Sequence, residues 1–369
     1  MRVGLLTPSI GSFGQRGFYN TQETGLARAL DKLVDETIVY KLISMEQEPS
    51  EELIEGCQHA MLKLVPAKSW GTNGLIDVKV LDGTLDAMVF FSDTQLCVPG
   101  VWRWAKKNGV KLFPYIGVLE SHSVNPGKKA LMNFLSRRNM RVYRKSPCFA
   151  KTPEVERQLR NKGVRDCALV PVGLDLTSLY KDYESTDRVG LKMKYGFGAE
   201  DRVILFVGRL TEEKQPLGMI RLFACLYGQN KGYRLLMVGT GDLKKDAEQE
   251  IEKLGISGAV KMLDRVPNSE IWQLYRLSEC FVNLNRQEIF GMAILEAMYY
   301  DCKVVAWHAP GPDFIIEDGV SGYLVDNEPS AVAVIQQKEI EPGLAHARIA
   351  EHFTWETAAN QMMDVMQRY

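Results

Sequence analysis

The chain has 369 residues and a net charge of −1, with 46% hydrophobic and 25% charged residues. This balance is typical of a soluble globular protein and excludes a disordered or fibrous one, and the length suits two domains better than one core. No apolar run approaches the roughly 20 residues of a membrane span. The apolar part of the N-terminus is too short for a signal peptide, so we expect a cytoplasmic protein.

The seven cysteines are scattered along the chain, and no two of them form a Cys-x-x-Cys pair. This usage indicates reduced, buried thiols in a cytoplasmic protein. It favours neither a disulfide framework nor a zinc site.

Charge is unevenly distributed, because residues 1–180 are basic in sum and residues 181–369 acidic. The excess concentrates between residues 128 and 165, where only Glu154 and Glu156 oppose Lys128, Lys129, Arg137, Arg138, Arg141, Arg144, Lys145, Lys151, Arg157, Arg160, Lys162 and Arg165. Such a patch suits an anionic membrane at its inner face or a phosphorylated acceptor, and a solvated helix face is the alternative. Aromatic residues do not interleave with the basic ones, so we expect no nucleic acid partner.

Strand-like and helical patterns alternate along the first half, which favours a parallel sheet with crossover helices. The predicted strands cover residues 2–6, 37–42, 61–65, 87–91, 111–116, 147–150 and 168–172, and the predicted helices cover 20–33, 98–108, 127–139 and 153–162. A polar, irregular segment follows, and we interpret residues 176–200 as a linker.

The alternation restarts after this segment. The predicted strands cover residues 202–208, 233–239, 260–263, 280–284, 303–307 and 322–325, and the predicted helices cover 215–229, 242–254, 268–277, a segment from 291 and a segment from 355. The fold class is therefore α/β, with doubly wound domains at 1–175 and 201–345 and a C-terminal helix within 346–369 that packs back on the first domain. Ligands of such sheets bind at the carboxyl ends of strands, so we expect the site in a cleft between the domains.

Residues 288–296, with the sequence EIFGMAILE, combine a helix start with two carboxylates. The free backbone N–H groups of a helix that begins at Gly291 favour a phosphate. Glu288 precedes this start and Glu296 lies further along the helix, and each is able to accept hydrogen bonds from sugar hydroxyls. The segment suits a nucleotide sugar, and an amphipathic helix with two solvated glutamates is the alternative.

Two strand ends that contain glycine add further candidate groups. Arg209 and Lys214 follow Gly208 and are able to place two positive charges beside a diphosphate. Gly239, at the end of another predicted strand, supplies a backbone wall for a nucleotide. A single Gly-x-Gly of this kind is only weak evidence for a dinucleotide site.

The order of the segments VGRLTEEK (207–214), VGTGD (238–242), EIFGMAILEAM (288–298) and DGVSGYLV (318–325) resembles the retaining glycosyltransferases of family four. The resemblance covers residues 202–326 and extends to 14–30, 152–175 and 353–362. It implies the GT-B fold, which consists of two facing Rossmann-like domains. It also implies transfer of a hexose-type sugar from a nucleoside diphosphate donor, expected to be UDP-linked, to a hydroxyl acceptor with retention of configuration.

The resemblance also implies residue roles. Arg209 and Lys214 match the pair that holds the donor diphosphate, Glu288 matches the acid at the donor sugar, and Glu296 matches the acid that binds the ribose hydroxyls. The other donor-binding positions are Gly14, Gly208, Gly239, Asn285, Phe290, Gly291, Met292 and Ala293. His122 matches a histidine that contacts the transferred sugar in some members, with Glu120 as its competitor.

Two positions depart from the family pattern. Leu284 and Asn285, followed by Arg286, stand where the family usually has Pro-Ser, and Val172 stands where it usually has Asn. These departures bear on donor and acceptor identity more than on reaction class.

The chain contains no Asp-x-Asp motif, so we expect no metal and no cofactor, the nucleotide sugar being a substrate. Charge on the leaving diphosphate is then expected to be stabilised by Arg209, Lys214 and the helix start at Gly291. The resemblance implies a sugar, lipid-linked or small-molecule acceptor. It also implies a role in the synthesis of a cell-surface polysaccharide or a glycolipid.

Two other functions stay open at this point. A nucleotide-sugar 2-epimerase has the same fold and needs no acceptor. A non-catalytic module would bind nucleotide or dock on a membrane through residues 128–165. An NAD-dependent dehydrogenase is less favoured, because Gly11, Gly14 and Gly17 are spaced Gly-x-x-Gly-x-x-Gly.

Overall fold

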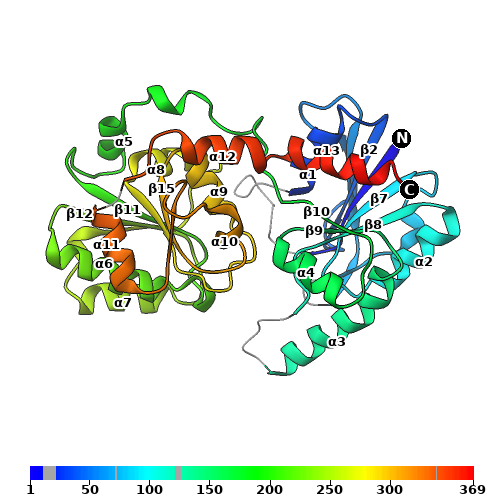
Figure 1. The fold of residues 1–369 in the computed structure, drawn as a ribbon, viewed down its shortest axis with the longest axis horizontal. Coiled ribbons are helices and arrows are strands. Elements are labelled where there is room, and N and C mark those ends of the chain that lie inside the picture. Colours follow the sequence, from blue (N-terminus) through cyan, green and yellow to red (C-terminus); the bar gives the residue numbers. More distant parts are fainter. Residues whose placement is uncertain (11–21, 71–72, 121–125, 338) are drawn as a thin grey trace. The chain divides into compact units, whose positions relative to one another are not determined.

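The computed structural model describes residues 1–10, 22–70, 73–120, 126–337 and 339–369, which form two compact units (Figure 1). The first unit comprises described residues up to Asp175 together with Thr354–Tyr369, and the second comprises those of Leu176–Phe353. None of the described helices is both long enough and apolar enough to cross a lipid bilayer.

The first unit is built on an eight-stranded sheet in the order β10-β9-β8-β7-β1-β2-β4-β3. Its strands are β1 (Arg2–Thr7), β2 (Glu36–Ile43), β3 (Ser50–Leu53), β4 (Ala60–Pro66), β7 (Ala87–Phe91), β8 (Lys111–Ile116), β9 (Cys148–Ala150) and β10 (Cys167–Leu169). All neighbours pair in parallel except β3 and β4. Leu5 lies in register with Val39 and Val89, and all three are fully buried, as expected for a sheet covered on both faces.

The other elements of the first unit surround this sheet or extend from it. They are α1 (Gln22–Leu30), the hairpin β5 (Lys68–Trp70) and β6 (Asn73–Leu75), η1 (Val78–Val80), α2 (Val98–Asn108), α3 (Pro126–Tyr143), α4 (Pro153–Asn161) and α13 (Trp355–Met366). The C-terminal helix α13 packs on α1, where a Cβ added to Gly25 would lie 2.4 Å from Trp355 Cδ1. Glycine at this position therefore permits the close approach of the two helices.

The second unit contains a parallel six-stranded sheet in the order β13-β12-β11-β14-β15-β16. Its strands are β11 (Arg202–Val207), β12 (Tyr233–Val238), β13 (Val260–Leu263), β14 (Cys280–Asn283), β15 (Lys303–Trp307) and β16 (Tyr323–Val325). Ile204 of β11 lies between Leu235 of β12 and Cys280 of β14, and all three are fully buried. The strand order reverses between β11 and β14, which is the topological switch point where open α/β sheets bind ligands.

Helices connect the strands of the second unit, and several lie where no helix was predicted. They are η2 (Asp182–Ser185), α5 (Arg188–Lys194), η3 (Glu212–Lys214), α6 (Pro216–Gln229), α7 (Lys244–Lys253), η4 (Ser257–Ala259), α8 (Ile271–Leu277), α9 (Met292–Tyr299), α10 (Pro312–Ile315), α11 (Glu328–Gln337) and α12 (Leu344–His352). Residues 176–200, interpreted from the sequence as a linker, carry η2 and α5. The Asp187 side chain caps α5 by accepting from Val189 N, so a capped turn forms where the polar composition indicated irregular chain. The segment 346–369 is likewise divided, because α12 belongs to the second unit and α13 to the first.

The predicted strands of both halves are present, and the prediction of two doubly wound α/β domains is confirmed. The strands β3, β5 and β6 were not predicted, because they are short and mostly exposed and carry little hydrophobic pattern. The seven cysteines are free thiols, of which Cys225 is exposed.

Candidate functional site

The candidate site lies at the switch point of the second sheet. The loop after β11 contains Gly208, Arg209 and Lys214, and the loop after β14 runs from Leu284 to Gly291. Because β11 and β14 are neighbours in the sheet, their carboxyl ends bring these two loops together. Lys214 and Glu288 are 74 positions apart in the sequence, and the strand order brings their loops side by side.

An ion pair joins the two loops. Lys214 Nζ lies 2.5 Å from Glu288 Oε2, and the side chains are 25% and 13% exposed. Asn283 Nδ2 and Asn285 Nδ2 each donate to the same Oε2 at 3.2 Å. One carboxylate oxygen therefore collects three donors, while Oε1 of Glu288 has no partner among the described residues and remains able to accept from a ligand hydroxyl.

Asn285 fixes the shape of this loop as well as contacting Glu288. Its Oδ1 accepts from Gln287 N at 2.9 Å, and its backbone N donates to Asn283 Oδ1 at 2.9 Å. The residue is almost fully buried. Asn285 was predicted as a donor-binding residue, whereas Asn283 was not, because it ends a buried strand and no motif marks it.

The helix α9 begins at the predicted glycine. Gly291 has φ +110°, in the region that favours glycine, and its carbonyl accepts from Ile294 N and Leu295 N. The N–H groups of Met292 and Ala293 lie in the first turn, where a helix offers them no acceptor. The start of α9 therefore combines two available donors with the positive end of the helix dipole beside Glu288.

The glycine-containing strand ends contact each other through their backbones. A Cβ added to Gly239 would lie 1.8 Å from Gly208 O, and the φ of Gly239 is +151°. Gly208 has open space, with no atom closer than 3.8 Å to an added Cβ. Gly239 is therefore required for close backbone packing, while Gly208 keeps the wall beside Arg209 free of side chain.

Arg209 lies on the same loop but is more exposed than Lys214. Its guanidinium pairs with Glu213 at 3.0 Å, and its side chain is 51% exposed. This pair is local to one loop, because the two residues are four apart in sequence. Arg209 thus lies beside the switch point with about half of its side chain exposed.

Glu296 is held by a residue that the sequence did not single out. Tyr275 of α8 donates its hydroxyl to Glu296 Oε2 at 2.8 Å. The Tyr275 ring is fully buried against Phe281 and Tyr300, so the hydroxyl has a fixed position. A tyrosine on an amphipathic helix carries no functional signal in sequence, and only its contact reveals it.

Two further residues of this loop, Phe290 and Arg286, contact aromatic rings of the second unit. The Phe290 ring is buried and meets Phe353 edge to face, with ring centroids 6.3 Å apart. Arg286 lies over the Trp307 ring at 4.1 Å and donates to Asp326 O. Phe290 thus anchors the loop by packing its ring on Phe353. The Arg286 guanidinium is held by the Trp307 ring and by the carbonyl of Asp326.

Three candidates lie in the N-terminal half of the sequence. Gly14 and His122 lie outside the described residues. Glu120 pairs with Lys162 at 3.0 Å and is 60% exposed. Among the described parts of both units, no group of three or more His, Cys, Asp or Glu side chains is arranged to hold a metal ion.

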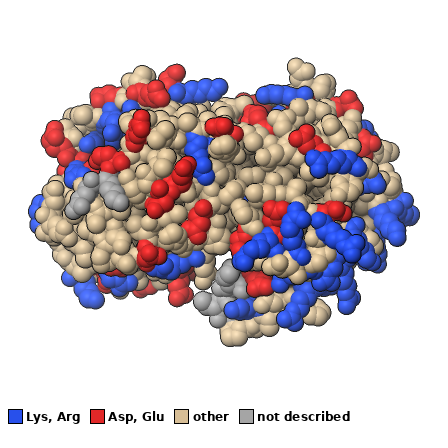
Figure 2. Space-filling view, viewed as in Figure 1, with Lys and Arg blue, Asp and Glu red and all other residues tan. Residues whose placement is uncertain are grey.

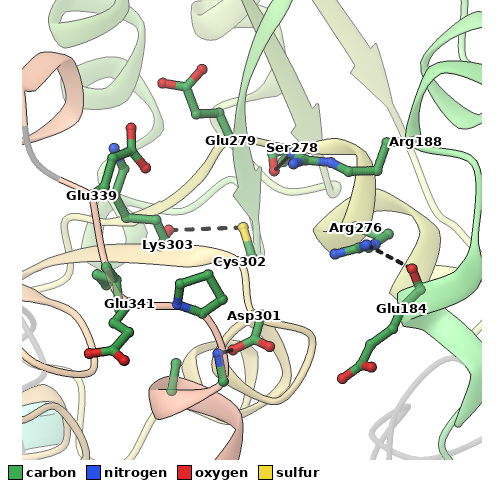
Figure 3. Close-up of a pocket in the computed structure, with 14 residues that line it drawn as sticks. Glu184, Arg188, Arg276, Ser278, Glu279, Asp301, Cys302, Lys303, Glu339 and Glu341 are labelled. Atoms are coloured by element: carbon green, nitrogen blue, oxygen red, sulfur yellow. Dashed lines mark hydrogen bonds between the residues drawn. The ribbon is translucent and has the colours of Figure 1, made fainter.

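A separate cavity of about 530 Å³ opens in the second unit at the opposite end of its sheet (Figure 3). Ser278, Glu279, Cys302 and Lys303 line it, and they stand at the amino ends of β14 and β15. Ligands of this fold class bind at the carboxyl ends, so the cavity is distinct from the candidate site.

Basic side chains gather over the part of the first unit that holds α2, α3 and α4 (Figures 1 and 2). The basic residues of α4 are neutralised locally, since Arg157 pairs with Glu154 and Arg160 with Glu156. Arg137 and Arg141 of α3 form no ion pair with any described residue. The predicted patch 128–165 therefore contains a paired part on α4 and an unpaired part on α3.

Comparison with known families gives a match at the second unit. Residues 190–345 match the family described as glycosyl transferases group 1. The chain is 24% identical over 178 residues to alpha-monoglucosyldiacylglycerol synthase of Acholeplasma laidlawii, covering 48% of this chain and 45% of the relative. It is 29% identical over 211 residues to D-inositol 3-phosphate glycosyltransferase of Rhodococcus jostii (strain RHA1), covering 53% and 46%. The chain thus spans about half the length of the curated relatives it matches.

Solved structures match the whole chain in fold. The Anabaena protein HepE in complex with UDP-glucose is 18% identical, with a TM-score of 0.75 over 100% of both chains. Sucrose-phosphate synthase from Thermosynechococcus elongatus is 16% identical, with a TM-score of 0.75 over 100% of this chain and 98% of that one. Residues 190–345 thus match the glycosyl transferases group 1 family, and the whole chain has the GT-B fold of its solved structural neighbours.

Proposed function

We propose that this protein is a retaining glycosyltransferase that binds a nucleoside diphosphate sugar in its second unit and transfers the sugar to a hydroxyl group. The observation that carries the proposal is the Lys214–Glu288 pair, which lies at the switch point beside the start of α9. A cation, a carboxylate with one free oxygen and two helix-end N–H groups are the groups that a sugar diphosphate needs.

Each group has a stated role in this proposal. Arg209, Lys214 and the N–H groups of Met292 and Ala293 bind the diphosphate, and they stabilise the negative charge that grows on it as the glycosidic bond breaks. Glu288 accepts hydrogen bonds from the donor sugar through Oε1. Glu296, positioned by Tyr275, accepts from the ribose hydroxyls.

The diphosphate is proposed to leave without help from a metal ion, because the cationic groups and the helix end supply the positive charge. Retention is proposed to follow from attack of the acceptor hydroxyl on the same face of the sugar from which the diphosphate departs. A diphosphate oxygen then takes the proton of the acceptor, so no side chain is required as a base.

The nature of the donor is proposed from the names of the relatives. HepE is described with UDP-glucose, and the two curated relatives are named as a monoglucosyldiacylglycerol synthase and an inositol 3-phosphate glycosyltransferase. A UDP-hexose donor and a glycolipid or glycan product are consistent with these names. Histidine at position 122 and glycine at position 14 stay proposals for contacts to the sugar and phosphates.

Thermal-shift measurement with a panel of UDP-, GDP- and ADP-sugars tests the donor. A ligand that binds only the folded protein raises the melting temperature with the logarithm of its saturation. We expect UDP-sugars to give the largest shift in the wild-type protein and a smaller shift in Glu288→Gln. The absence of a shift with every nucleotide sugar contradicts the proposal, and release of an epimerised nucleotide sugar without acceptor identifies the epimerase instead.

A peripheral contact with the inner face of a membrane is proposed for α3. The sequence indicated the whole basic stretch 128–165, and the proposal is now limited to this helix. Phe134 is 64% exposed and Leu131 is 38% exposed, and both lie on the outward face of α3 with Arg137 and Arg141. Lys145 Nζ and Lys106 Nζ lie 5.5 and 5.7 Å from the centre of the Trp102 ring. Exposed apolar side chains surrounded by unpaired cations suit an anionic bilayer surface.

Co-sedimentation with vesicles of phosphatidylglycerol and phosphatidylcholine tests this contact. We expect binding that falls with salt and that is lost in Phe134→Ser and in the double variant Arg137→Gln/Arg141→Gln. Arg157→Gln is the matched control, because Arg157 lies in the same basic stretch but pairs with Glu154. Equal binding to neutral vesicles, or loss in the control variant, contradicts the proposal.

A further inference from the structure

Three parallel strands of the first sheet place an acid, a glycine and a lysine side by side. Phe91, Tyr115 and Phe149 are in register on β7, β8 and β9. Two residues further along each chain segment stand Asp93, Gly117 and Lys151. Side chains alternate along a strand, so these residues share one face at the carboxyl edge of the sheet.

Gly117 leaves the space that the lysine side chain occupies. A Cβ added to Gly117 would lie 3.0 Å from Lys151 Cδ. The side chain of Lys151 therefore extends across the end of β8 towards Asp93. The Lys151 ammonium lies over two aromatic rings, 4.9 Å from the centre of the Tyr115 ring and 5.4 Å from the centre of the Phe91 ring.

The ammonium of Lys151 is incompletely bonded. It donates to Gln22 Oε1 at 3.2 Å, and no carboxylate lies within 4.0 Å of it among the described residues. An ammonium has three N–H donors. Within the described parts of the chain, two of these donors therefore have no hydrogen-bond acceptor and face this edge.

Asp93 is fixed in place with one oxygen unused. Its Oδ1 accepts from Gly117 N at 2.7 Å and from Val118 N at 2.8 Å, while its Oδ2 has no partner among the described residues. The hydroxyl of Tyr115 is buried and also has no partner within the described parts of the chain. Unsatisfied polar groups at the end of a sheet indicate that a polar ligand or water belongs there.

The balance of charge around this edge decides what kind of ligand fits. Glu23 pairs with Lys41 at 2.8 Å, and both side chains are largely buried. With Asp93 and Lys151 the four groups sum to zero, and the field of Asp93 and Glu23 acts on the ammonium. An added anion would meet two carboxylates, whereas a hydroxyl group accepts from Lys151 and donates to Asp93.

We propose that Asp93 and Lys151 bind hydroxyl groups of the acceptor, which is a sugar or another uncharged polyol. This inference rests on the proposed transferase function and assigns its acceptor specificity to the first unit. The edge lies at the switch point of the first sheet, where the strand order reverses between β1 and β7. Burial raises the pKa of Asp93 and lowers the pKa of Lys151, while their mutual attraction opposes both shifts, in agreement with a coupled pair.

Saturation-transfer NMR on the full chain with UDP tests the inference. The probes are myo-inositol, methyl α-D-glucopyranoside and glycerol, each offered separately. We expect transfer to at least one probe in the wild-type protein and its loss in Asp93→Asn and in Lys151→Met. Lys107→Met is the control, because Lys107 is an exposed lysine of α2 in the same unit, and it is expected to keep the signal.

A third variant, Gly117→Ala, tests the same site without removing a charge. Gly117→Ala displaces the Lys151 stem without altering any charge, and it is expected to weaken the signal as well. Folding of each variant is followed by near-ultraviolet circular dichroism, and any one folded variant that retains the full signal overturns the inference.

Two further outcomes also overturn it. These are absence of transfer to all three probes in the wild-type protein, and displacement of the bound probe by inorganic phosphate, which would identify an anion site. If UDP raises the melting temperature while no polyol binds, only this inference fails. If a polyol binds while no nucleotide does, the proposed donor site fails.

Discussion

Lys214 and Glu288 form an ion pair of 2.5 Å that connects the loop after β11 to the loop after β14. The pair crosses the switch point of the second sheet, and both side chains are mostly buried. The ammonium proposed to bind the diphosphate is therefore held by the carboxylate proposed to bind the sugar. The proposed donor binding therefore depends on a contact that also connects the two loops.

Lys214→Ala is expected to lower the stability of the second unit and to abolish donor binding. It leaves the partly buried carboxylate of Glu288 with only two amide donors, and an uncompensated buried charge is costly. Glu288→Gln keeps the shape and removes the charge, so we expect turnover to fall with a smaller loss of stability. Urea unfolding and steady-state kinetics of both variants measure the two effects.

A double variant tests whether Lys214 and Glu288 contribute to stability jointly or independently. Lys214→Ala/Glu288→Gln is expected to be more stable than the sum of the two single changes predicts, by about 0.5–3 kcal/mol. Lys244→Ala is the control, because its pair with Asp264 lies on the surface. Additive single effects would show that the two residues act separately.

Arg209→Ala is expected to lower kcat by about 10²–10³-fold, the usual cost of one charge-stabilising group. The melting temperature should change little, because the side chain is half exposed and its pair with Glu213 lies within one loop. Initial rates with saturating donor measure the effect. Arg221→Ala, on the surface of α6, serves as control, and near-normal turnover of the Arg209 variant would remove the electrostatic mechanism.

Tyr275→Phe is expected to raise the donor KM several-fold while kcat stays close to the wild-type value. The change removes the hydroxyl that donates to Glu296 Oε2 and leaves the buried ring in place. Glu296 then loses this hydrogen bond, and a lost hydrogen bond to a charged group costs about 1.5–3 kcal/mol. Tyr195→Phe, which removes a hydroxyl bonded to Gln273, controls for loss of a tyrosine hydroxyl. Unchanged donor KM would limit Tyr275 to a structural role.

Gly239→Ala is expected to destabilise the second unit by more than about 1 kcal/mol. The added Cβ would collide with the carbonyl oxygen of Gly208, and φ +151° disfavours a side chain. Gly228→Ala in α6 meets no atom within 4 Å and is expected to stabilise by about 0.4–1 kcal/mol. Chemical denaturation should show changes of opposite sign in the free energy of unfolding of the two variants. Equal changes would contradict the close packing of the strand ends.

Asp301→Asn is expected to flatten the pH dependence of stability. Burial raises the pKa of Asp301, although the N–H groups of Gly343 and His346 oppose this shift by bonding its Oδ1. The unfolded chain then releases the proton first, near the ordinary value of about 3.9. Wild-type stability should therefore fall as the pH rises from that value through the higher pKa of the folded state.

The asparagine variant has no such titration and tolerates the φ of +52° at this position. It is expected to equal or exceed the wild-type stability at neutral pH. Urea unfolding at a series of pH values measures the difference, with the exposed Asp264→Asn as control. A wild-type protein that gains stability relative to the variant over this interval would refute the assignment.

The sequence allowed most of the sheet architecture to be predicted, because buried parallel strands are continuous apolar runs such as those around Leu5 and Ile204. It did not allow α5 to be predicted, since that helix depends on the Asp187 cap and on a hydrogen bond from Arg188 to Ser278 O. The short strands β3, β5 and β6 were not predicted for the same reason, because each forms only by pairing with a neighbouring strand.

The candidate site divides in a similar way. The sequence by itself determined which segments were candidates for donor binding, because a glycine before an apolar helix and a glycine after a strand are local features of the chain. Only the tertiary structure decided that Lys214 meets Glu288, that Tyr275 positions Glu296, and that Asp93 and Lys151 share an edge with Gly117 between them. Those contacts depend on which strands are neighbours and on the register between them, and residues far apart in sequence carry no local signal of either.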